Sequence, residues 1–151
     1  MPDEVTFGRF NGCYRHKVDD KGRMPIPFRW RPDESIELTL VIWPKHQAGT
    51  CLRVLLPEQW NTLLADIEAM PNRDPNKAVL KRRIGTSSAL VKLDNVGRIT
   101  IPAEMAKAAD ISKDAVLAGM IDRFEIWSPK RYEQVEALDN AVVNQALQEM
   151  Q

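Results

Sequence analysis

Two regions of the chain alternate hydrophobic and polar residues with the period of two that is typical of β-strands. In each region the alternation stops at a short turn that contains glycine, Asp19–Gly22 in the first and Asp94–Gly97 in the second, and then resumes. Alternating segments on both sides of such a turn predict a strand–turn–strand unit. The pattern therefore predicts the same hairpin-like unit twice.

Each unit ends at a proline, Pro27 or Pro102, which can occupy the first turn of a helix. After Pro102 we expect a helix over residues 103–109. After Pro27 a further proline, Pro32, limits any helix to a single turn over residues 28–31.

A pair of strands and a helix follow in each half. Strand-like segments occupy residues 37–43 and 51–56, with a loop expected at 44–50, and the matching segments of the second half are 115–120 and 123–127. Apolar residues then recur near i, i+3, i+4 and i+7, which predicts helices with an apolar face that forms core or subunit contacts rather than a ligand site. These residues are Trp60, Leu63, Leu64 and Ile67 in the first half and Tyr132, Val135, Leu138 and Val142 in the second.

The two halves share residues at an offset of 75 positions. Lys17, Asp19, Gly22, Arg23, Ile26 and Pro27 recur as Lys92, Asp94, Gly97, Arg98, Ile101 and Pro102. We interpret the chain as an α+β fold of two tandem units, residues 8–70 and 87–143, separated by a linker and short helix at 71–86. One such half buries only a modest core, so we expect it to pair with its copy or with other subunits.

Charge is balanced overall but segregated along the sequence. Lys and Arg together number 21, as do Asp and Glu, so the net charge is zero; this excludes a globally basic nucleic-acid binder but not a locally basic one. Residues 9–31 hold seven basic and two acidic side chains, a net +5, and residues 73–83 hold five and one, a net +4. The second cluster fits a solvated face as well as a binding surface.

The cysteines and the apolar segments indicate a cytoplasmic protein. Cys13 and Cys51 occupy unmatched positions in the two halves, which indicates reduced thiols rather than a disulfide framework. No apolar run approaches the roughly 18 residues of a membrane span, and no secretory signal is recognisable at the start. We expect no membrane partner, and polar, loose ends at residues 1–9 and 144–151.

Residue types that carry out catalysis are scarce. The two histidines, His16 and His46, are isolated from each other, and the position of His16 on an alternating segment favours a structural role. The sequence contains no zinc-ligand spacing, no nucleotide-binding glycine loop and no nucleophile elbow. We therefore expect no enzymatic activity, no cofactor, no metal and no small-molecule substrate.

The repeated turn places an aspartate four residues before an arginine. Such a pair can brace the turn, and the arginine keeps further donors that suit phosphate or guanine. We favour DNA contact for Arg23, which lies inside the +5 segment, and the structural pairing for Arg98, which has few basic neighbours in sequence. The full set of candidate DNA-binding residues is Arg15, Lys17, Lys21, Arg23 and Arg98, with Asp19 and Asp94 as motif partners.

A single basic turn binds DNA weakly and loses affinity with salt, because each phosphate contact releases condensed counterions. Several copies of the turn on an oligomer would bind repeated sequence elements with avidity. We therefore expect a homo-oligomer whose partner is double-stranded DNA with repeated short elements.

Residues 10–27, 80–102 and 116–127 carry a family resemblance. With both D-x-x-x-R motifs and G-x-x-D-R-F-E-I-W in order, the chain resembles the MraZ family of bacterial transcriptional regulators from about residue 10 to 138. The resemblance implies two AbrB-like (SpoVT-AbrB) swapped-hairpin units, ring oligomers, nucleoid association, and binding to short direct repeats upstream of cell-division and cell-wall genes. On this chain the motif arginines are Arg23 and Arg98, with Asp19 and Asp94 as partners.

A second hypothesis is an oligomeric assembly or interaction protein that has lost specific DNA recognition. The zero net charge favours it, as does Asn11, which stands where a basic residue is frequent in the family. An absence of any DNA complex at low salt would favour this second hypothesis.

Overall fold

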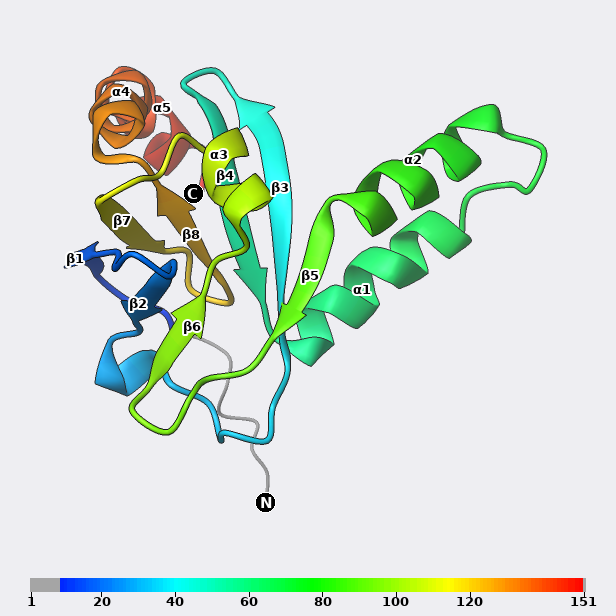
Figure 1. The fold of residues 1–151 in the computed structure, drawn as a ribbon. Helices are drawn as coiled ribbons and strands as arrows, with labels where there is room; N and C mark the ends of the chain where they lie inside the picture. Colours follow the sequence, from blue (N-terminus) through cyan, green and yellow to red (C-terminus); the bar gives the residue numbers. More distant parts are fainter. Residues whose placement is uncertain (1–8, 151) are drawn as a thin grey trace.

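The computed structural model of the chain describes residues 9–150, and its elements form two similar series (Figure 1). The first series is β1 (Cys13–Lys17), β2 (Arg23–Pro25), the 3₁₀ turn η2 (Phe28–Trp30), β3 (Leu38–His46), β4 (Gly49–Leu55) and α1 (Pro57–Glu68). Helix α2 (Pro75–Thr86) leads to the second series, β5 (Ser88–Val91), β6 (Arg98–Thr100), α3 (Ala103–Ala108), β7 (Asp114–Gly119), β8 (Phe124–Trp127), α4 (Pro129–Asn140) and α5 (Val143–Gln148). The α+β class is confirmed.

Six strands form one antiparallel sheet in the order β1-β7-β8-β4-β3-β5, and β2 pairs with β6 in a separate two-stranded ribbon. The edge strands are exchanged between the halves, because β1 pairs with β7 and β5 pairs with β3. Strands β4 and β8 join the halves at the centre of the sheet. The two halves of the chain therefore share one sheet and one ribbon, while the unit boundaries predicted from the sequence stay a prediction.

The pairing of equivalent residues gives the chain an approximate twofold symmetry. Met24 and Ile99 correspond at the offset of 75 and are directly opposite each other in the ribbon. Arg53 and Glu125, 72 positions apart, are directly opposite each other in the sheet. A residue that pairs with its own equivalent lies on the axis relating the two halves, so the axis passes through both pairs.

The main core lies between the sheet and the ribbon and draws on both halves. The aromatic rings of Phe10, Trp30 and Phe124 contact one another, with Trp30 and Phe124 5.0 Å apart between ring centroids. The indole Nε1 of Trp30 donates to the backbone oxygen of Asn11 at 3.0 Å, which satisfies its one polar atom. Met24 and Ile99 extend this core from the inner face of the ribbon.

Several predicted elements are present with close bounds. The single turn expected over residues 28–31 is η2, and the helix expected over 103–109 is α3. The predicted strands of the second half are β7 and β8.

The loop predicted at residues 44–50 is wrong. Strand β3 continues to His46 and β4 begins at Gly49, so only two residues separate them. The register shifts between Trp43 and His46. Proline cannot donate to a strand ladder, and an irregularity of this kind lets the strand continue past Pro44.

The segments outside the two predicted units are more helical than the sequence indicated. Helix α2 occupies Pro75–Thr86 of the segment 71–86 in which a linker and a short helix were expected, and it begins at Pro75 because the side chain of Asp74 caps it by accepting from Asn76 N at 2.9 Å. The polar tail expected to be loose forms α5. The predicted loose segment at the start lies, except for Arg9, outside the described residues.

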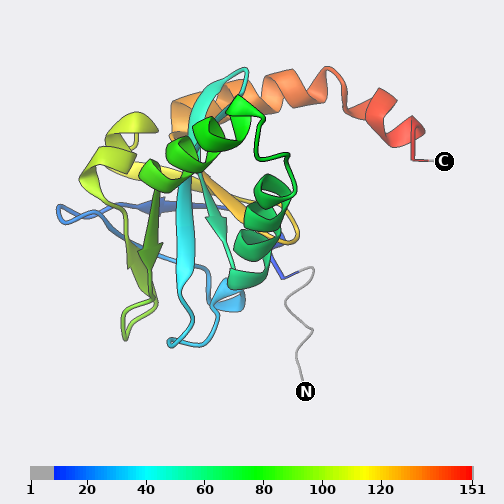
Figure 2. The ribbon, with the colours of Figure 1, turned by 90° about the vertical axis from the view of Figure 1, so that its right-hand side faces the viewer.

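Figures 1 and 2 show the α1–α2 hairpin and the carboxyl-terminal helices projecting from the sheet in different directions. Within residues 9–150, none of these helices has the combination of length and apolar character needed to cross a membrane.

Candidate nucleic-acid interface

The first repeated turn is organised around the carboxylate of Asp19. Its Oδ1 accepts from the backbone N–H groups of Lys21 at 3.0 Å and Arg23 at 2.8 Å, and its Oδ2 accepts from Arg23 Nε at 2.8 Å. The backbone closes the turn through Gly22 N, which donates to Asp19 O at 2.9 Å. One aspartate therefore fixes both the turn and the direction of the arginine.

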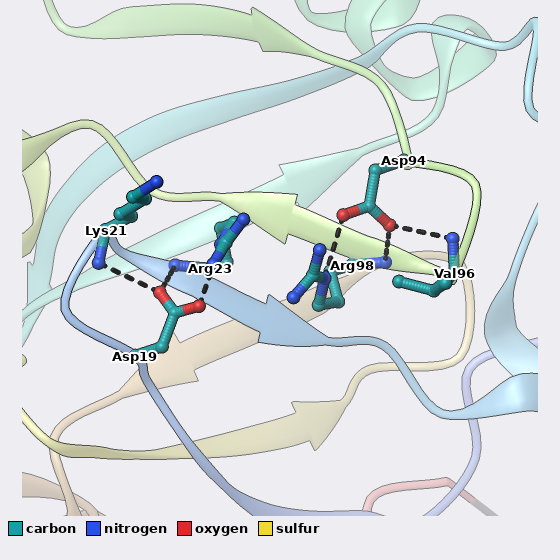
Figure 3. Close-up of polar contacts among 6 residues, drawn as sticks. All are labelled: Asp19, Lys21, Arg23, Asp94, Val96 and Arg98. Carbon is teal, nitrogen blue, oxygen red and sulfur yellow. Dashed lines mark hydrogen bonds and ion pairs between the residues drawn. The ribbon is translucent and has the colours of Figure 1, made fainter.

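The second turn repeats this geometry (Figure 3). Asp94 Oδ1 accepts from the N–H groups of Val96 at 3.0 Å and Arg98 at 2.8 Å, and Oδ2 accepts from Arg98 Nε at 2.8 Å. The pairing that the sequence favoured for Arg98 is thus present, and Arg23 is held in the same way. The two arginines differ little in exposure, at 34% for Arg23 and 33% for Arg98.

Each turn is also fixed by the strand of the other half. Gly22 O accepts from Ile101 N at 2.8 Å, and Gly97 O accepts from Ile26 N at 3.0 Å. Gly22 has a φ of +80°, and a Cβ atom at this position would lie 2.7 Å from the backbone oxygen of Ile101. Glycine is therefore required here both by the left-handed backbone and by the close approach of the partner strand.

The local hydrogen bonds lower the pKa of both motif aspartates. For Asp19 the largest cause is the backbone N–H of Arg23, and for Asp94 it is the backbone N–H of Arg98. Desolvation opposes the shift, and the arginine side chain adds to it. Both carboxylates are therefore ionised at neutral pH and hold the Nε of the arginines.

The remaining donors of the two guanidinium groups are available for a ligand. Within residues 9–150, Nη1 and Nη2 of Arg23 and Arg98 make no hydrogen bond to protein atoms. Each Nη carries two N–H groups, in the planar arrangement that binds phosphate or guanine in a bidentate manner.

The ribbon places both arginines on one face. Met24 and Ile99 point into the core, so their neighbours along each strand point outward. Arg23 is opposite Thr100 and Arg98 is opposite Pro25, which makes the arginines diagonal neighbours across the ribbon. Figure 3 shows both side chains on the same ribbon, each beside its own aspartate.

The other candidate residues lie on the turn and on β1. Lys21 is exposed in the first turn. Arg15 and Lys17 are exposed on β1, an edge of the six-stranded sheet, and Lys17 forms an ion pair with Asp114 at 3.6 Å. The structure therefore brings Arg23 and Arg98 together on the ribbon, with Lys21 in the adjoining turn, while Arg15 and Lys17 lie on β1 of the six-stranded sheet.

Arg31 lies against the second turn but was not among the candidate DNA-binding residues predicted from the sequence. Its Nε donates to Ile26 O at 2.7 Å, and its guanidinium lies where a Cβ atom on Gly97 would be. Arg98 was expected to have few basic neighbours, but the fold brings Arg31 against its turn. The only sequence signal for Arg31 was its membership of the +5 segment.

His16 lies partly buried on β1. Desolvation lowers the pKa of His16, and the charge of Arg31 lowers it further. Its Nε2 is buried and has no hydrogen-bond partner in the described part of the chain.

No group of three or more His, Cys, Asp or Glu side chains in residues 9–150 is arranged to hold a metal ion.

Known proteins resemble this chain over most of its length. A protein of Roseiflexus castenholzii named transcriptional regulator MraZ is 34% identical over 128 residues, which cover 83% of this chain and 85% of the relative. The chain belongs to the MraZ family. The family model described as MraZ protein, antitoxin-like, matches residues 86–150.

Other members of the family show similar identity. Proteins that are also named transcriptional regulator MraZ are 35% identical in Xanthomonas campestris pv. campestris and 33% identical in Ruegeria sp.. The first comparison covers 82% of this chain and 84% of the relative, and the second covers 85% and 82%. The similarity therefore extends over both repeats.

Proposed function

We propose that this chain is a sequence-specific DNA-binding transcriptional regulator. It binds short direct repeats upstream of cell-division and cell-wall genes, and it does so as a ring oligomer. Its relatives are named transcriptional regulators, which supports a regulatory role. The observation that carries the proposal is the pair of aspartate-held arginines, Arg23 and Arg98, on one face of the β2–β6 ribbon.

A two-stranded ribbon has dimensions that fit the major groove of B-DNA, which is about 12 Å wide. Arg23 and Arg98 are held by their aspartates before any DNA arrives, so little side-chain freedom is lost on binding. Their free Nη groups suit guanine O6 and N7 or backbone phosphates. Lys21 adds charge to the same turn, and Arg15 and Lys17 can reach phosphates beside it.

The exchange of β1 and β5 between the halves supports a further part of the proposal, that the chain is a tandem AbrB-like swapped-hairpin fold. In this arrangement the two halves of one chain together form one symmetric ribbon, as the two identical subunits of a dimer would. One chain then presents one ribbon, and a ring of chains presents several.

Several ribbons on one ring would bind successive direct repeats with avidity, since each additional contact is intramolecular. A regulator of this kind acts in the cytoplasm and associates with the nucleoid.

The test is a mobility-shift titration on the DNA upstream of the gene that encodes the chain. We expect Arg23→Ala and Arg98→Ala each to weaken binding by about 1–3 kcal/mol, or roughly five- to 150-fold. Lys45→Ala is the matched control, because it removes one exposed positive charge from β3. Affinity should fall with salt, and the loss of a phosphate contact lowers the slope by about one.

The outcomes separate the hypotheses. If the wild-type protein forms no complex at low salt, the chain is not a DNA-binding regulator, and the assembly-protein hypothesis is favoured. If the wild-type protein binds DNA but Lys45→Ala weakens binding as much as Arg23→Ala does, the ribbon is not the contact surface. Arg23→Lys keeps the charge without the planar guanidinium, so a loss with this variant indicates bidentate recognition.

A further inference from the structure

The two ends of the β2–β6 ribbon share one backbone geometry but carry different side chains. At each end, a repeated turn of one half lies beside the segment that follows the ribbon strand of the other half. The second turn lies beside η2, which follows β2, and the first turn lies beside α3, which follows β6. Figure 3 shows Lys21 of the first turn and Val96 of the second at opposite ends of the ribbon.

The second-turn end, formed by Asp94–Gly97 and η2, carries two exposed apolar side chains. Phe28 is 80% exposed and Val96 is 56% exposed. Both line one hollow of about 220 Å³, and the lining also includes Asp94, which holds Arg98. The apolar pair therefore adjoins the arginine that we propose as a DNA contact.

Arg31 connects the two apolar residues' elements at this end. Its Nε donates to Ile26 O at 2.7 Å, and its guanidinium carbon lies 5.5 Å from the ring centroid of Phe28, within the range of a cation–π contact. The same guanidinium lies against Gly97, which is buried. The exposed ring of Phe28 is therefore linked through Arg31 to the second turn.

The first-turn end, formed by Asp19–Gly22 and α3, lacks these side chains. At the offset of 75 positions, the equivalents of Phe28, Val96 and Arg31 are Ala103, Lys21 and Ala106. All three equivalents are among the residues that line a hollow of about 360 Å³ beside the first turn. One end of the ribbon thus presents an apolar pair, and the other presents an ammonium group and two methyl groups.

The apolar pair at the second-turn end suits a small apolar group. Two side chains offer too little surface for a protein partner, since specific protein interfaces bury at least about 1,000 Å². In the major groove of DNA, the apolar group on the base edges is the C5 methyl group of thymine, and phenylalanine is one of the side chains that contact it. A ribbon that binds with Arg98 toward the base edges brings this pair beside the same bases.

We propose that Phe28, together with Val96, contacts a thymine methyl group and fixes the direction in which the chain binds each repeat. A ribbon with two identical ends would bind a sequence equally well in both directions, because its twofold axis exchanges the ends. A direct repeat has a direction, so it must be recognised by residues that differ between the ends. This inference rests on the DNA binding of the proposed function and adds a base contact and a direction to it.

The first experiment measures binding to the DNA upstream of the gene that encodes the chain, made once with thymine and once with uracil, which lacks the C5 methyl group. The measured quantity is the dissociation constant on uracil DNA divided by that on thymine DNA. We expect a ratio of about four or more for the wild type, which is the effect of burying one methyl group, and a ratio close to one for Phe28→Ala. Leu147→Ala is the matched control, because it removes an exposed apolar side chain from α5, and it should keep the wild-type ratio.

Two outcomes of this experiment overturn the inference. One is a wild-type ratio close to one, and the other is a Phe28→Ala protein that keeps the wild-type ratio. General effects of uracil on DNA shape act on both proteins alike, so they do not imitate the expected result. Since Phe28 is largely exposed, its replacement should leave the fold intact, and circular dichroism checks this.

A second experiment measures the direction of binding. Asp20→Cys and Asn95→Cys place a cysteine at equivalent exposed positions of the two turns, each combined with Cys13→Ser to remove the exposed native thiol. An iron–EDTA group attached to the new cysteine cleaves the DNA close to it. We expect the first-turn reagent to cut on one side of every repeat and the second-turn reagent on the other side. Equal cuts on both sides from each reagent would contradict the proposal.

A double variant tests whether the apolar pair sets this direction. Phe28→Ala with Val96→Lys gives the second-turn end the same two residues that the first-turn end has in Ala103 and Lys21. With this variant the cuts from each reagent should fall on both sides of every repeat. Cuts that stay on one side would show that other residues set the direction, and the assignment to Phe28 and Val96 would be wrong.

The failure of this inference is distinguishable from the failure of the proposed function. If the wild-type chain forms no complex with thymine DNA, the proposed function fails and the inference fails with it. If the chain binds thymine and uracil DNA equally well, the thymine contact fails and the DNA-binding regulator stands.

Discussion

Arg53 and Glu125 lie opposite each other on the paired strands β4 and β8, and Arg53 Nε donates to Glu125 Oε2 at 3.0 Å. The other carboxylate oxygen of Glu125 accepts from Trp127 Nε1 at 2.9 Å, and the guanidinium of Arg53 lies 4.5 Å from the ring centroid of Trp43. This ion pair lies on the approximate twofold axis and connects the two halves of the chain at the centre of the sheet.

Arg53→Ala should lower the free energy of unfolding by about 1–3 kcal/mol. The side chain of Glu125 is only 12% exposed, so its carboxylate would lose a partner in a site that water reaches poorly. Urea denaturation at fixed protein concentration measures the change. The control is Lys17→Ala, which breaks the exposed pair with Asp114 and should have little effect. Equal losses for both variants would contradict the prediction.

Gly22→Ala should destabilise the chain by about 1–3 kcal/mol or more. The left-handed backbone disfavours alanine, and its Cβ atom would collide with Ile101 O, so the β2–β6 ribbon would have to shift. Gly85→Ala is the control, because Gly85 is helical and has open space around its Cβ direction; it should stabilise the chain by about 0.5–1 kcal/mol. Thermal unfolding checks both, and a neutral Gly22→Ala would mean that the turn is less constrained than its contacts indicate.

Acid should weaken the repeated turns. The folded-state pKa values of Asp19 and Asp94 are lowered, so the unfolded chain binds more protons, and stability rises with pH across this range. Their contribution is therefore complete above the unfolded pKa of about 4 and is lost as pH falls through the lower folded values. Asp19→Asn with Asp94→Asn should flatten the dependence of stability on pH below about pH 4.

The measurement for the turns is urea denaturation of the wild type and of the double variant at a series of acidic pH values. Asp33→Asn is a control, because Asp33 has a lowered pKa but lies outside both turns. If the double variant keeps the full wild-type slope, the two turn carboxylates do not contribute to the acid sensitivity.

The two thiols should differ in reactivity. Cys13 is exposed, whereas Cys51 is buried, and burial, reinforced by the charge of Glu125, raises the pKa of its thiol. Since the thiolate is the reactive form, a thiol reagent should modify Cys13 in the native protein and Cys51 only after unfolding. Absorbance of the released chromophore measures this, and Cys13→Ser should abolish the native-state reaction. A rapid native reaction in that variant would show that Cys51 is accessible.

The sequence predicted the local features of the candidate site. Asp19 and Arg23 are four residues apart, as are Asp94 and Arg98. Hydrogen bonds within each of these two short segments close its turn. The position of glycine in the turn also follows from local backbone geometry. For the same reason the single turn after Pro27 and the helix after Pro102 were predicted with close bounds.

The sequence predicted the lengths and the burial of strands and helices less well where tertiary contacts override local signals. The proline at position 44 suggested a loop, but pairing with β4 carries β3 past it. The apolar faces of α1 and α4 suggested core or subunit contacts, and the structure buries only Ile67 and Val135 of the eight residues that define those faces. A periodic pattern shows that a face is apolar, but it does not show what covers it.

The sequence by itself determined the repeated turn, its aspartate–arginine pairing and the family, because these depend on residues close together in the chain or on motifs in order. Only the tertiary structure decided that β1 and β5 exchange between halves, that Arg23 and Arg98 share one face of a ribbon, and that Arg31 lies against the second turn. Such contacts join residues between 47 and 105 positions apart in the chain, and they depend on which strands pair. Local periodicity carries no information about that choice, because the same alternating segment can pair with either half.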